Sequence, residues 1–554
     1  MSIKNTTNRP CWPVIGIVGA AALLRLLLLG LKPPHFDEGV NGWFIDEMTK
    51  HGFYHYDPSN YHGPLHFYLL FLFHSVMGRS IWALRLPVVL ISILSVFWVT
   101  KFDRFFGRRA CLFAALAMAL SPGMVFYGRY AIHESELVFF LMLMTWGFAG
   151  LWQFGERKYL WALGLGFTGT ILTKETYFIH LACFILAAGT LWLFEKLSPS
   201  APLPRAIQLW KGRDLAAVVA AGAGLILFFY SGGFLDPVLL STQPVLIHNS
   251  PVPVPGFLIN TFWSPYAAWF QTGTNGNGHE KTSYDLLTLH FTRGSGENAR
   301  VTAFTLFNYY WIALITRYEW ITLAGLAGLL RLLWPNTNRL IRFIAIYGTG
   351  TLAAYSLVPY KTPWCIITLI WPFFFVFGYL CDGLSRRMKL IFLPLVSLLC
   401  IATLLQTARL NFFHYTDEDE PYVYVQTLND INKLTDPLFK LVAGDPSACH
   451  LAGHIILSSY HPIPWLLGDF TAVGYYSADT LPPVLDADFL LVDGSRVSEI
   501  EKMLKNRYFT APLKLRGSQD PAKLYLSFEK FSGIFPEREP EFKPKSGDED
   551  PTKP

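Results

Sequence analysis

Long apolar runs that carry almost no charge constrain this chain more than any other feature. Of its 554 residues, 52% are hydrophobic and only 15% are charged, whereas an average soluble domain carries about 25% charged residues. Because the charges are clustered, the stretches between them stay neutral for about 20 residues, the length at which a helix crosses a bilayer. The sequence therefore predicts an integral membrane protein with many spans.

The neutral runs predict about eleven membrane-spanning helices, within a range of about 11–13. They lie near residues 12–31, 81–100, 110–127, 135–153, 159–173, 176–194, 214–234, 319–334, 340–358, 363–381 and 390–407. The segment 302–316 is ambiguous between a span and a surface segment. A surface position is favoured, because only then do the basic loops alternate with the others along the whole chain.

Basic residues mark every second short loop, and the positive-inside rule makes these loops cytoplasmic. Examples are Arg104, Arg157, Arg205, Arg339 and Arg386. The opposite loops are longer and less basic, and two of them, 32–80 and 232–302, are large. The first contains Val40, Trp43, Phe44 and Met48 at helical spacing, which predicts a short amphipathic helix at the membrane surface.

The composition changes after Leu410, where shorter apolar runs begin. We expect a membrane domain over 1–410, an external α/β domain over 411–535 and a disordered tail over 536–554. The expected strands and helix of the second domain are Phe439–Val442, Phe489–Val492, Lys523–Phe528 and Val497–Lys505. The predicted fold class is an all-α polytopic membrane domain followed by a C-terminal external α/β domain.

The charge and the cysteines exclude two classes of function. The net charge is only +5, and the basic residues sit in short loops, so the sequence has no nucleic-acid footprint. The seven cysteines form no CxxC pair, which argues against a structural zinc site. No cofactor is required by any motif.

Asp37 and Glu38 follow the first apolar run directly and are the most informative acidic residues. At the outer membrane edge, one of them could act as a general base or bind a divalent cation. Equally, Asp37 could cap the helix that we expect from Val40. The residue pattern alone leaves both interpretations open.

Three further motifs place charge at the outer ends of predicted spans. Arg129 and Glu134 lie between the third and fourth spans, Lys174 and Glu175 follow the fifth, and Lys361 stands in a short external connection. A phosphate could be bound by these cations. Alternatively, Arg129 pairs with Glu134 or Glu136, Lys174 anchors its span at the interface, and Lys361 contacts lipid headgroups in general.

The external loops supply candidate substrate-binding residues as well. His62 lies in the first loop, and His279 and Lys281 follow a stretch rich in glycine and asparagine in the second. No HExxH motif accompanies the histidines. Asp37 and Glu134 remain the candidate ligands of a divalent metal.

The order of these motifs resembles the GT-C glycosyltransferases, in the branch of dolichyl-phosphate-mannose protein mannosyltransferases and aminoarabinose transferases (glycosyltransferase family 39). Within that superfamily it is most similar to a bacterial and archaeal subgroup described as flippase-associated. The matching motifs are Asp37-Glu38, Tyr56-Asp57-Pro58, Tyr61-His62-Gly63-Pro64-Leu65, Arg85-Leu86-Pro87, Arg129 with Glu134, Lys174-Glu175, Lys361-Thr362-Pro363-Trp364, Pro421-Tyr422-Val423-Tyr424-Val425-Gln426-Thr427 and Ile463-Pro464-Trp465. Where many relatives have Asp, this chain has the longer Glu134.

The resemblance implies a membrane enzyme that transfers a sugar from a polyprenyl phosphate to a glycan, lipid or protein acceptor on the extracytoplasmic face, with inversion. Asp37 would be the base, Glu38 the second choice, and Glu134 a supporting acid. Arg129, Lys174 and Lys361 would bind the donor phosphate, and His62, Glu175, His279 and Lys281 would contact substrate. The alternative is a non-catalytic, flippase-associated or transport protein that handles lipid-linked sugars at the cell membrane.

Overall fold

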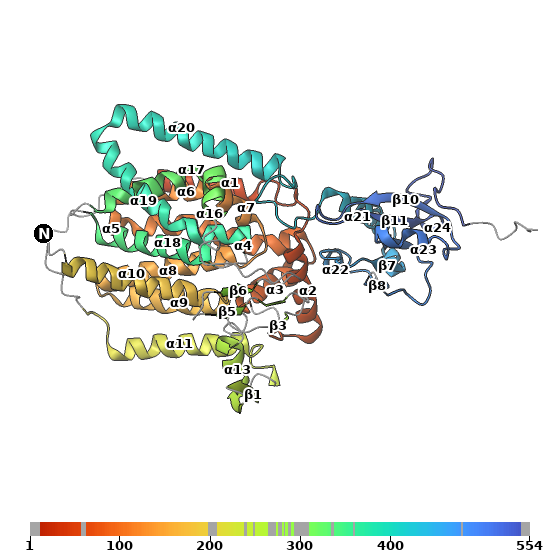
Figure 1. The fold of residues 1–554 in the computed structure, drawn as a ribbon, viewed down its shortest axis with the longest axis horizontal. Coiled ribbons are helices and arrows are strands. Elements are labelled where there is room, and N and C mark those ends of the chain that lie inside the picture. Colours follow the sequence, from red (N-terminus) through yellow and green to blue (C-terminus); the bar gives the residue numbers. More distant parts are fainter. Residues whose placement is uncertain are drawn as a thin grey trace, which may run out of the picture. The chain divides into compact units, whose positions relative to one another are not determined.

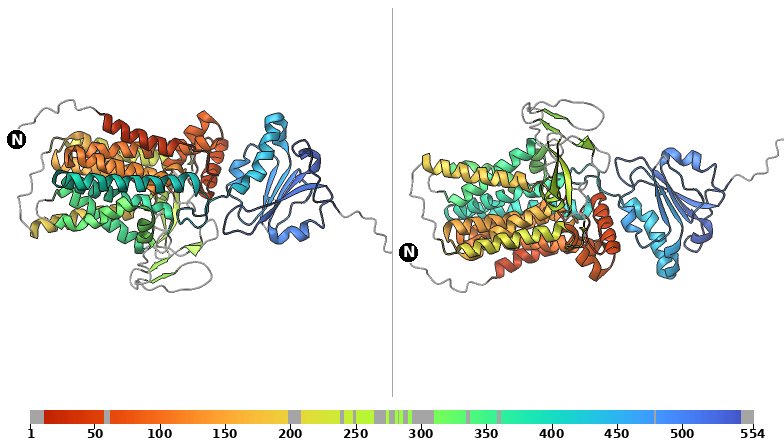
Figure 2. Two further views of the ribbon diagram at one scale, coloured as in Figure 1. Left: turned by 90° about the horizontal axis from the view of Figure 1, so that it is seen from above. Right: turned by 90° about the horizontal axis from the view of Figure 1, so that it is seen from below.

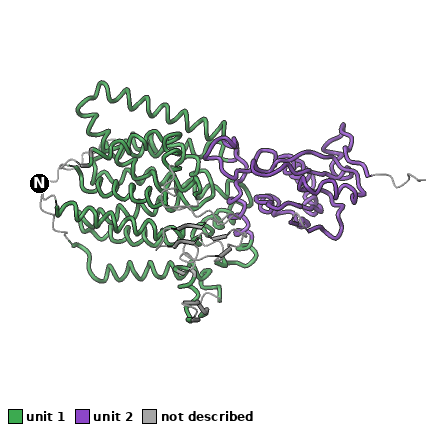
Figure 3. The backbone as a smooth tube through the Cα atoms, viewed as in Figure 1, with its two compact units in different colours: residues 1–29, 47–414 green, residues 30–46, 415–554 purple. Residues whose placement is uncertain are grey.

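A computed structural model (Figure 1 and Figure 2) describes residues 11–56, 62–197, 208–237, 241–247, 250–263, 273–274, 280–281, 283–285, 290–292, 310–333, 337–357, 361–477 and 480–544. The chain forms two compact units (Figure 3). Unit 1 contains Met1–Leu29 and Glu47–His414, and unit 2 contains Gly30–Asp46 and Tyr415–Pro554. The segment with Asp37 and Glu38 therefore clusters with the C-terminal residues.

Unit 1 is built mainly of helices. Its main helices are α1 (Trp12–Leu26), α3 (Leu65–Met77), α4 (Ile81–Val99), α6 (Arg108–Leu120), α7 (Pro122–Phe126), α8 (Glu134–Gln153), α9 (Arg157–Thr173), α10 (Tyr177–Leu197), α11 (Gly212–Tyr230), α16 (Tyr310–Tyr318), α17 (Trp320–Ala327), α18 (Arg339–Leu357), α19 (Ile366–Arg387) and α20 (Lys389–Ala408). They lie largely side by side (Figure 1). Helix α2 (Phe36–His51) begins in unit 2 and ends in unit 1.

Among the described residues, seven helices are long and apolar enough to cross a membrane, or up to nine if two bent pairs each form one span. The pairs are Arg108–Leu120 with Pro122–Arg129, bent by 61°, and Tyr310–Tyr318 with Trp320–Leu330, bent by 114°. The runs expected near 12–31 and 159–173 form the shorter helices α1 and α9, of 15 and 17 residues. The number of spans, about eleven, stays a prediction.

The first large loop differs from the expectation. The amphipathic helix exists as α2 but begins at Phe36, four residues earlier than Val40. A second helix, α3, was not predicted, and its 13 residues rise only about 20 Å at 1.5 Å per residue. Because the hydrocarbon core is about 30 Å thick, α3 is too short to cross it. A search for apolar runs of about 20 residues therefore does not find this helix.

The second large loop contains a hairpin of β1 (Thr242–Ile247) and β2 (Ser250–Pro255), joined in antiparallel register. Two short pairs follow, β3 (Gly273–Thr274) with β4 (Glu280–Lys281) and β5 (Ser283–Asp285) with β6 (His290–Thr292). Of the ambiguous segment 302–316, residues 302–309 lie outside the described part, and the remainder opens α16.

Helices α8 and α9 approach each other closely, because glycines lie at their contact. A Cβ on Gly147 would overlap the backbone of Leu163, and a Cβ on Gly166 would overlap the backbone of Met144. Small residues let helix backbones meet inside a bilayer, where hydrophobic burial drives no association. The close pairing brings the first residue of α8 beside the end of α9.

Unit 2 contains a five-stranded sheet with strand order β10-β11-β9-β7-β8. The strands are β7 (Gly453–Ile456), β8 (Val473–Tyr476), β9 (Phe489–Val492), β10 (Tyr508–Leu513) and β11 (Ala522–Ser527), and the main helix is α21 (Asn432–Gly444). Strands β9, β7 and β8 run parallel, while β10 and β11 are antiparallel. Leu491 packs in one core and Leu490 in the other, as expected when both faces of a sheet are covered.

The fold class predicted for the chain is confirmed, although two of its α/β elements were assigned wrongly. Strands β9 and β11 lie where two of the predicted strands were expected. Phe439–Val442 instead belongs to α21, because a short apolar run cannot distinguish a strand from a buried helix. The helix expected over Val497–Lys505 is only α23 (Val497–Ile500).

The tail expected to be disordered from residue 536 is ordered in its first part. Phe542 forms an antiparallel bridge with Tyr508, and their backbone N–H groups and carbonyls exchange hydrogen bonds of 3.0 Å. The composition, rich in Pro, Glu and Lys, does not reveal this local pairing. Residues 545–554 lie outside the described residues.

Candidate functional site

A buried ion pair joins two of the predicted motifs in unit 1. Glu134 is the first residue of α8, where a helix favours negative charge, and Lys174 follows the last residue of α9, where it favours positive charge. Lys174 Nζ donates to Glu134 Oε1, and the two side chains are 7% and 2% exposed. The antiparallel contact of α8 with α9 thus places a paired anion and cation away from water.

Three histidines and two more carboxylates surround this pair. His62 Nδ1 lies 2.6 Å from Glu175 Oε2, and His66 Nδ1 lies 2.8 Å from Glu136 Oε1. The centroid of the His133 ring lies 4.6 Å from that of the His62 ring and 4.1 Å from that of the His66 ring. We call these five residues with Glu134 and Lys174 the polar cluster. Its buried charges have partners, which is the condition for burying them.

The loop with Lys361 reaches the polar cluster through its neighbours. Thr362 Oγ1 lies 3.2 Å from Cys365 Sγ, and that thiol lies 4.0 Å from Glu134 Oε1. Lys361 itself is half-buried. The structure therefore brings together Glu134, Lys174, Glu175, His62 and the 361–365 segment.

Arg129 has a different environment from the one expected. Its guanidinium donates to the carbonyls of Leu24, Arg25, Leu27 and Leu28, which lie at the end of α1, where backbone acceptors lack helical partners. Glu134 and Glu136 pair instead with Lys174 and His66. The alternative in which Arg129 forms an ion pair with either glutamate is therefore wrong.

Asp37 and Glu38 lie in the first turn of α2 and have different surroundings. Glu38 is buried, and its Oε2 accepts a 2.8 Å hydrogen bond from the backbone N–H of His35. The N–H of Asp37 donates to His35 Nδ1 at 3.0 Å, while the Asp37 side chain is 37% exposed. The Glu38 carboxylate thus accepts a hydrogen bond from a backbone N–H at the start of α2, as in a capping box. The carboxylate of Asp37 does not have this role.

Not every sequence-predicted residue is described. His279 lies outside the described residues, and Lys281 is placed only as part of strand β4. Sequence reasoning did not assign His66, His133, Glu136 or Cys365 to the site, and it considered Glu136 only as an ion-pair partner of Arg129. His66 lies at the start of α3, four residues after His62, which precedes the helix; this spacing was the one signal in the sequence that pointed to His66. In the described part of the chain, no group of three or more His, Cys, Asp or Glu could hold a metal ion.

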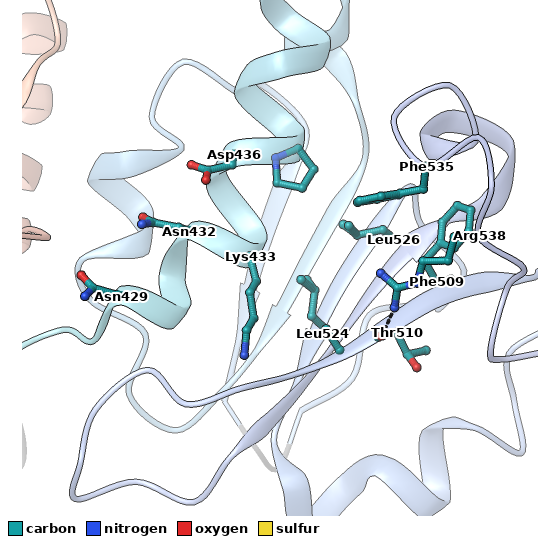
Figure 4. A pocket seen from close by; sticks show the side chains of 12 residues that line it. Asn429, Asn432, Lys433, Asp436, Phe509, Thr510, Leu524, Leu526, Phe535 and Arg538 are labelled. Atoms are coloured by element: carbon teal, nitrogen blue, oxygen red, sulfur yellow. Dashed lines mark hydrogen bonds between the residues drawn. The ribbon is translucent and has the colours of Figure 1, made fainter.

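Unit 2 has a cavity of its own, of about 320 Å³, between α21 and strands β10 and β11 (Figure 4). Leu524, Leu526 and Phe509 supply apolar lining. Its cations have partners, since Lys433 lies 3.0 Å from Asp430 and Arg538 lies 2.6 Å from Glu541. Asn429, Asn432 and Asp436 add polar lining, so the cavity does not by itself define a class of ligand.

His461 of unit 2 is partly buried near Arg516 and Asp37. Burial, with a smaller contribution from the Arg516 charge, lowers the pKa of His461 from 6.5 to about 4, while Asp37 acts in the opposite direction. Burial also lowers the pKa of His35. Between pH 6.5 and 4 the unfolded chain therefore binds more protons than the folded one, and the folded state gains stability as the pH rises.

We expect the thermal unfolding temperature of unit 2, measured in the full chain, to fall as the pH is lowered from 6.5 to about 4. The fall should be smaller in His461→Gln, because glutamine does not titrate and the substitution removes one of three histidines of unit 2 whose pKa is lowered, the others being His35 and His454. Unfolding monitored by near-UV circular dichroism at several pH values measures this slope. An identical slope in the wild type and the variant would show that His461 is not a source of it.

The comparisons with known proteins agree with this architecture. The family model of dolichyl-phosphate-mannose-protein mannosyltransferases matches residues 61–199, a stretch that includes all seven residues of the polar cluster. A search of curated protein sequences finds no match. The crystal structure of ArnT from Cupriavidus metallidurans bound to undecaprenyl phosphate is similar with a TM-score of 0.59 at 11% identity, covering 93% of this chain and 98% of that chain.

The apo state of the same ArnT gives a TM-score of 0.57 at 14% identity and covers 92% of this chain and 97% of that chain. An oligosaccharyltransferase from Archaeoglobus fulgidus gives a TM-score of 0.49 at 13% identity and covers 94% of this chain and 74% of that chain. The chain has the fold of the GT-C glycosyltransferases, as its motifs predict. The flippase-associated subgroup stays a prediction.

Proposed function

We propose that this protein is a membrane glycosyltransferase that moves a sugar from a polyprenyl phosphate to an acceptor hydroxyl. The observation that carries the proposal is the polar cluster, which lies entirely within the part of the chain that resembles dolichyl-phosphate-mannose-protein mannosyltransferases. The similarity over 93% of the chain to a structure bound to undecaprenyl phosphate supports a lipid-phosphate donor.

In the proposed reaction, the Asp37 carboxylate takes the proton of the acceptor hydroxyl as that oxygen attacks the anomeric carbon. The bond from this carbon to the phosphate oxygen breaks, and polyprenyl phosphate leaves with the electron pair. A single displacement of this kind inverts the anomeric centre. Asp37 is the better candidate because its carboxylate is partly exposed, whereas that of Glu38 is buried on a backbone N–H.

Cations that meet the developing charge on the phosphate would lower the barrier. We assign this role to Lys174 and Lys361, with Glu134 holding Lys174 in place. A donor phosphate would compete with Glu134 for the Lys174 ammonium. The strength of the ion pair therefore affects how tightly Lys174 binds the phosphate. Arg129 would have to release the α1 carbonyls in order to bind phosphate, and it is therefore the weakest of the three candidates.

The arrangement of basic loops supports an orientation with the first loop, and hence Asp37, on the extracytoplasmic side of the cell membrane. A nucleotide sugar is not available there, whereas the lipid of a polyprenyl-phosphate donor partitions into the bilayer and presents its sugar at that face. The acceptor would be a glycan, a lipid or a protein.

Sugar transfer by the purified protein tests the proposal. The protein in nanodiscs should release polyprenyl phosphate from at least one member of a panel of synthetic polyprenyl-phosphate hexoses and pentoses, when acceptors are supplied. The same sugars on nucleotides should give no product. Absence of turnover with every donor and acceptor, by protein that still binds a donor lipid, would favour the transport alternative.

A further inference from the structure

The ring of Phe36, next to Asp37, lies between two side chains of the C-terminal part of unit 2. The ring of His461 meets it edge-on with a centroid distance of 5.4 Å, and the Arg516 guanidinium lies 5.0 Å from its centroid. Arg516 is buried and donates to the carbonyls of His461 and Ser459 at 2.5 and 2.9 Å. Hydrogen bonds to His461 and Ser459 therefore fix the position of the Arg516 guanidinium, and a cation–π contact with this guanidinium holds the Phe36 ring.

Two glycines allow α2 to approach the same region. A Cβ on Gly39 would overlap the Cα and Cβ of Pro462, and a Cβ on Gly42 would overlap the indole of Trp465. Three residues apart, Gly39 and Gly42 lie on one face of the helix. The Trp465 side chain is 2% exposed, so it has little room to move. A larger residue at either position requires the helix, Pro462 or Trp465 to move.

Hydrogen bonds continue this contact on the other side of Asp37. Gln426 Nε2 donates to the carbonyl of Pro33 at 2.9 Å, and the His35 ring donates from Nε2 to the carbonyl of Tyr424 at 2.7 Å. Contacts at residues 33, 35, 36, 39 and 42 thus bracket Asp37, whose own side chain is partly exposed.

We propose that the C-terminal part of unit 2 positions the segment that carries Asp37, with Arg516, Pro462 and Trp465 as positioning residues. The inference rests on the proposed function of Asp37 as the base. A base acts only if it is held within hydrogen-bond reach of the acceptor proton, and a displacement of about 1 Å can cost about 10²-fold in rate. The C-terminal residues contribute to the reaction by fixing this geometry and not by contact with the substrate.

Gly39→Ala and Gly42→Ala test the inference, because the intrinsic preference of alanine for helices and the new contact should act in opposite directions. Alanine stabilises a helix interior by about 1 kcal/mol relative to glycine, so a loss of function in either variant must come from the new contact with Pro462 or Trp465. We expect turnover to fall by about 10²-fold, with donor affinity unchanged. Amides of residues 35–42 should exchange hydrogen faster than in the wild type.

Gly16→Ala is the matched control, since it is also helical and a Cβ there meets nothing within 4 Å. Its turnover and hydrogen exchange should equal those of the wild type. Arg516→Lys should retain more turnover than Arg516→Ala, because lysine keeps a cation over Phe36 while losing the forked hydrogen bonds.

Wild-type turnover and exchange in both glycine variants would overturn the inference, as would faster exchange of residues 35–42 without any loss of turnover. Failure of the proposed function gives a different result. If Asp37→Asn keeps its turnover while Gly39→Ala loses it, the base assignment is wrong and the segment is held for another reason. If Asp37→Asn is inactive and Gly39→Ala is fully active, the base stands and the positioning role falls.

Discussion

Replacing Asp37 with asparagine should lower turnover by about 10²–10⁴-fold, the usual worth of a positioned general base. Asparagine keeps the size and shape of the side chain but cannot take a proton from an acceptor hydroxyl at neutral pH. The affinity for the donor should change little, because in the proposed reaction the phosphate and the lipid bind elsewhere. Initial rates and donor binding, measured on the same preparation in nanodiscs, separate the two quantities.

Glu38→Gln is the matched control at the neighbouring carboxylate. Glutamine can still accept the hydrogen bond that Glu38 takes from the His35 N–H, so the helix start should survive and turnover should fall far less. If Glu38→Gln is inactive and Asp37→Asn is nearly normal, the two roles are reversed. If both variants transfer sugar normally, the acidic pair only orders the start of α2, and a transport protein becomes the better description.

Hydropathy predicted the long helices well because each is one continuous neutral run. Helices α4, α8, α10, α11, α18, α19 and α20 all lie where a span was expected. Hydropathy fails where an apolar run is shorter than a span, or too short for its periodicity to distinguish a helix from a strand. Helix α3 is apolar but shorter than a span, and the run Phe439–Val442, predicted as a strand, is part of α21, which continues through Pro437.

The motifs of the polar cluster could be selected from the sequence, but their pairing could not. Glu134 and Lys174 are forty residues apart, and their contact depends on how closely α8 approaches α9. Arg129 was expected to bind a phosphate or to pair with a glutamate, yet its guanidinium donates hydrogen bonds to backbone carbonyls at the end of α1. Main-chain acceptors at a helix end leave no trace in a residue pattern. The partners of a buried charge are decided by packing.

Lys174→Met should destabilise the protein by about 3–5 kcal/mol, because it leaves the Glu134 carboxylate buried without its cation. Methionine has nearly the length of lysine and fills the same space, so the loss comes from the charge and not from a cavity. Glu134→Gln should have a similar effect for the opposite reason. Thermal unfolding in detergent, followed for both single variants, measures the loss. Both variants should also lose turnover, since the proposed phosphate site is disrupted.

The double variant Lys174→Met with Glu134→Gln separates stability from function. Replacing both members of a buried pair by neutral residues of similar volume is often close to neutral for stability, so its unfolding temperature should return toward that of the wild type. Turnover and donor binding should remain low, because the cation that meets the phosphate is still absent. A double variant that regains full turnover would show that the pair only holds α8 on α9. The phosphate would then have to be bound by other cations, with Lys361 the first to test.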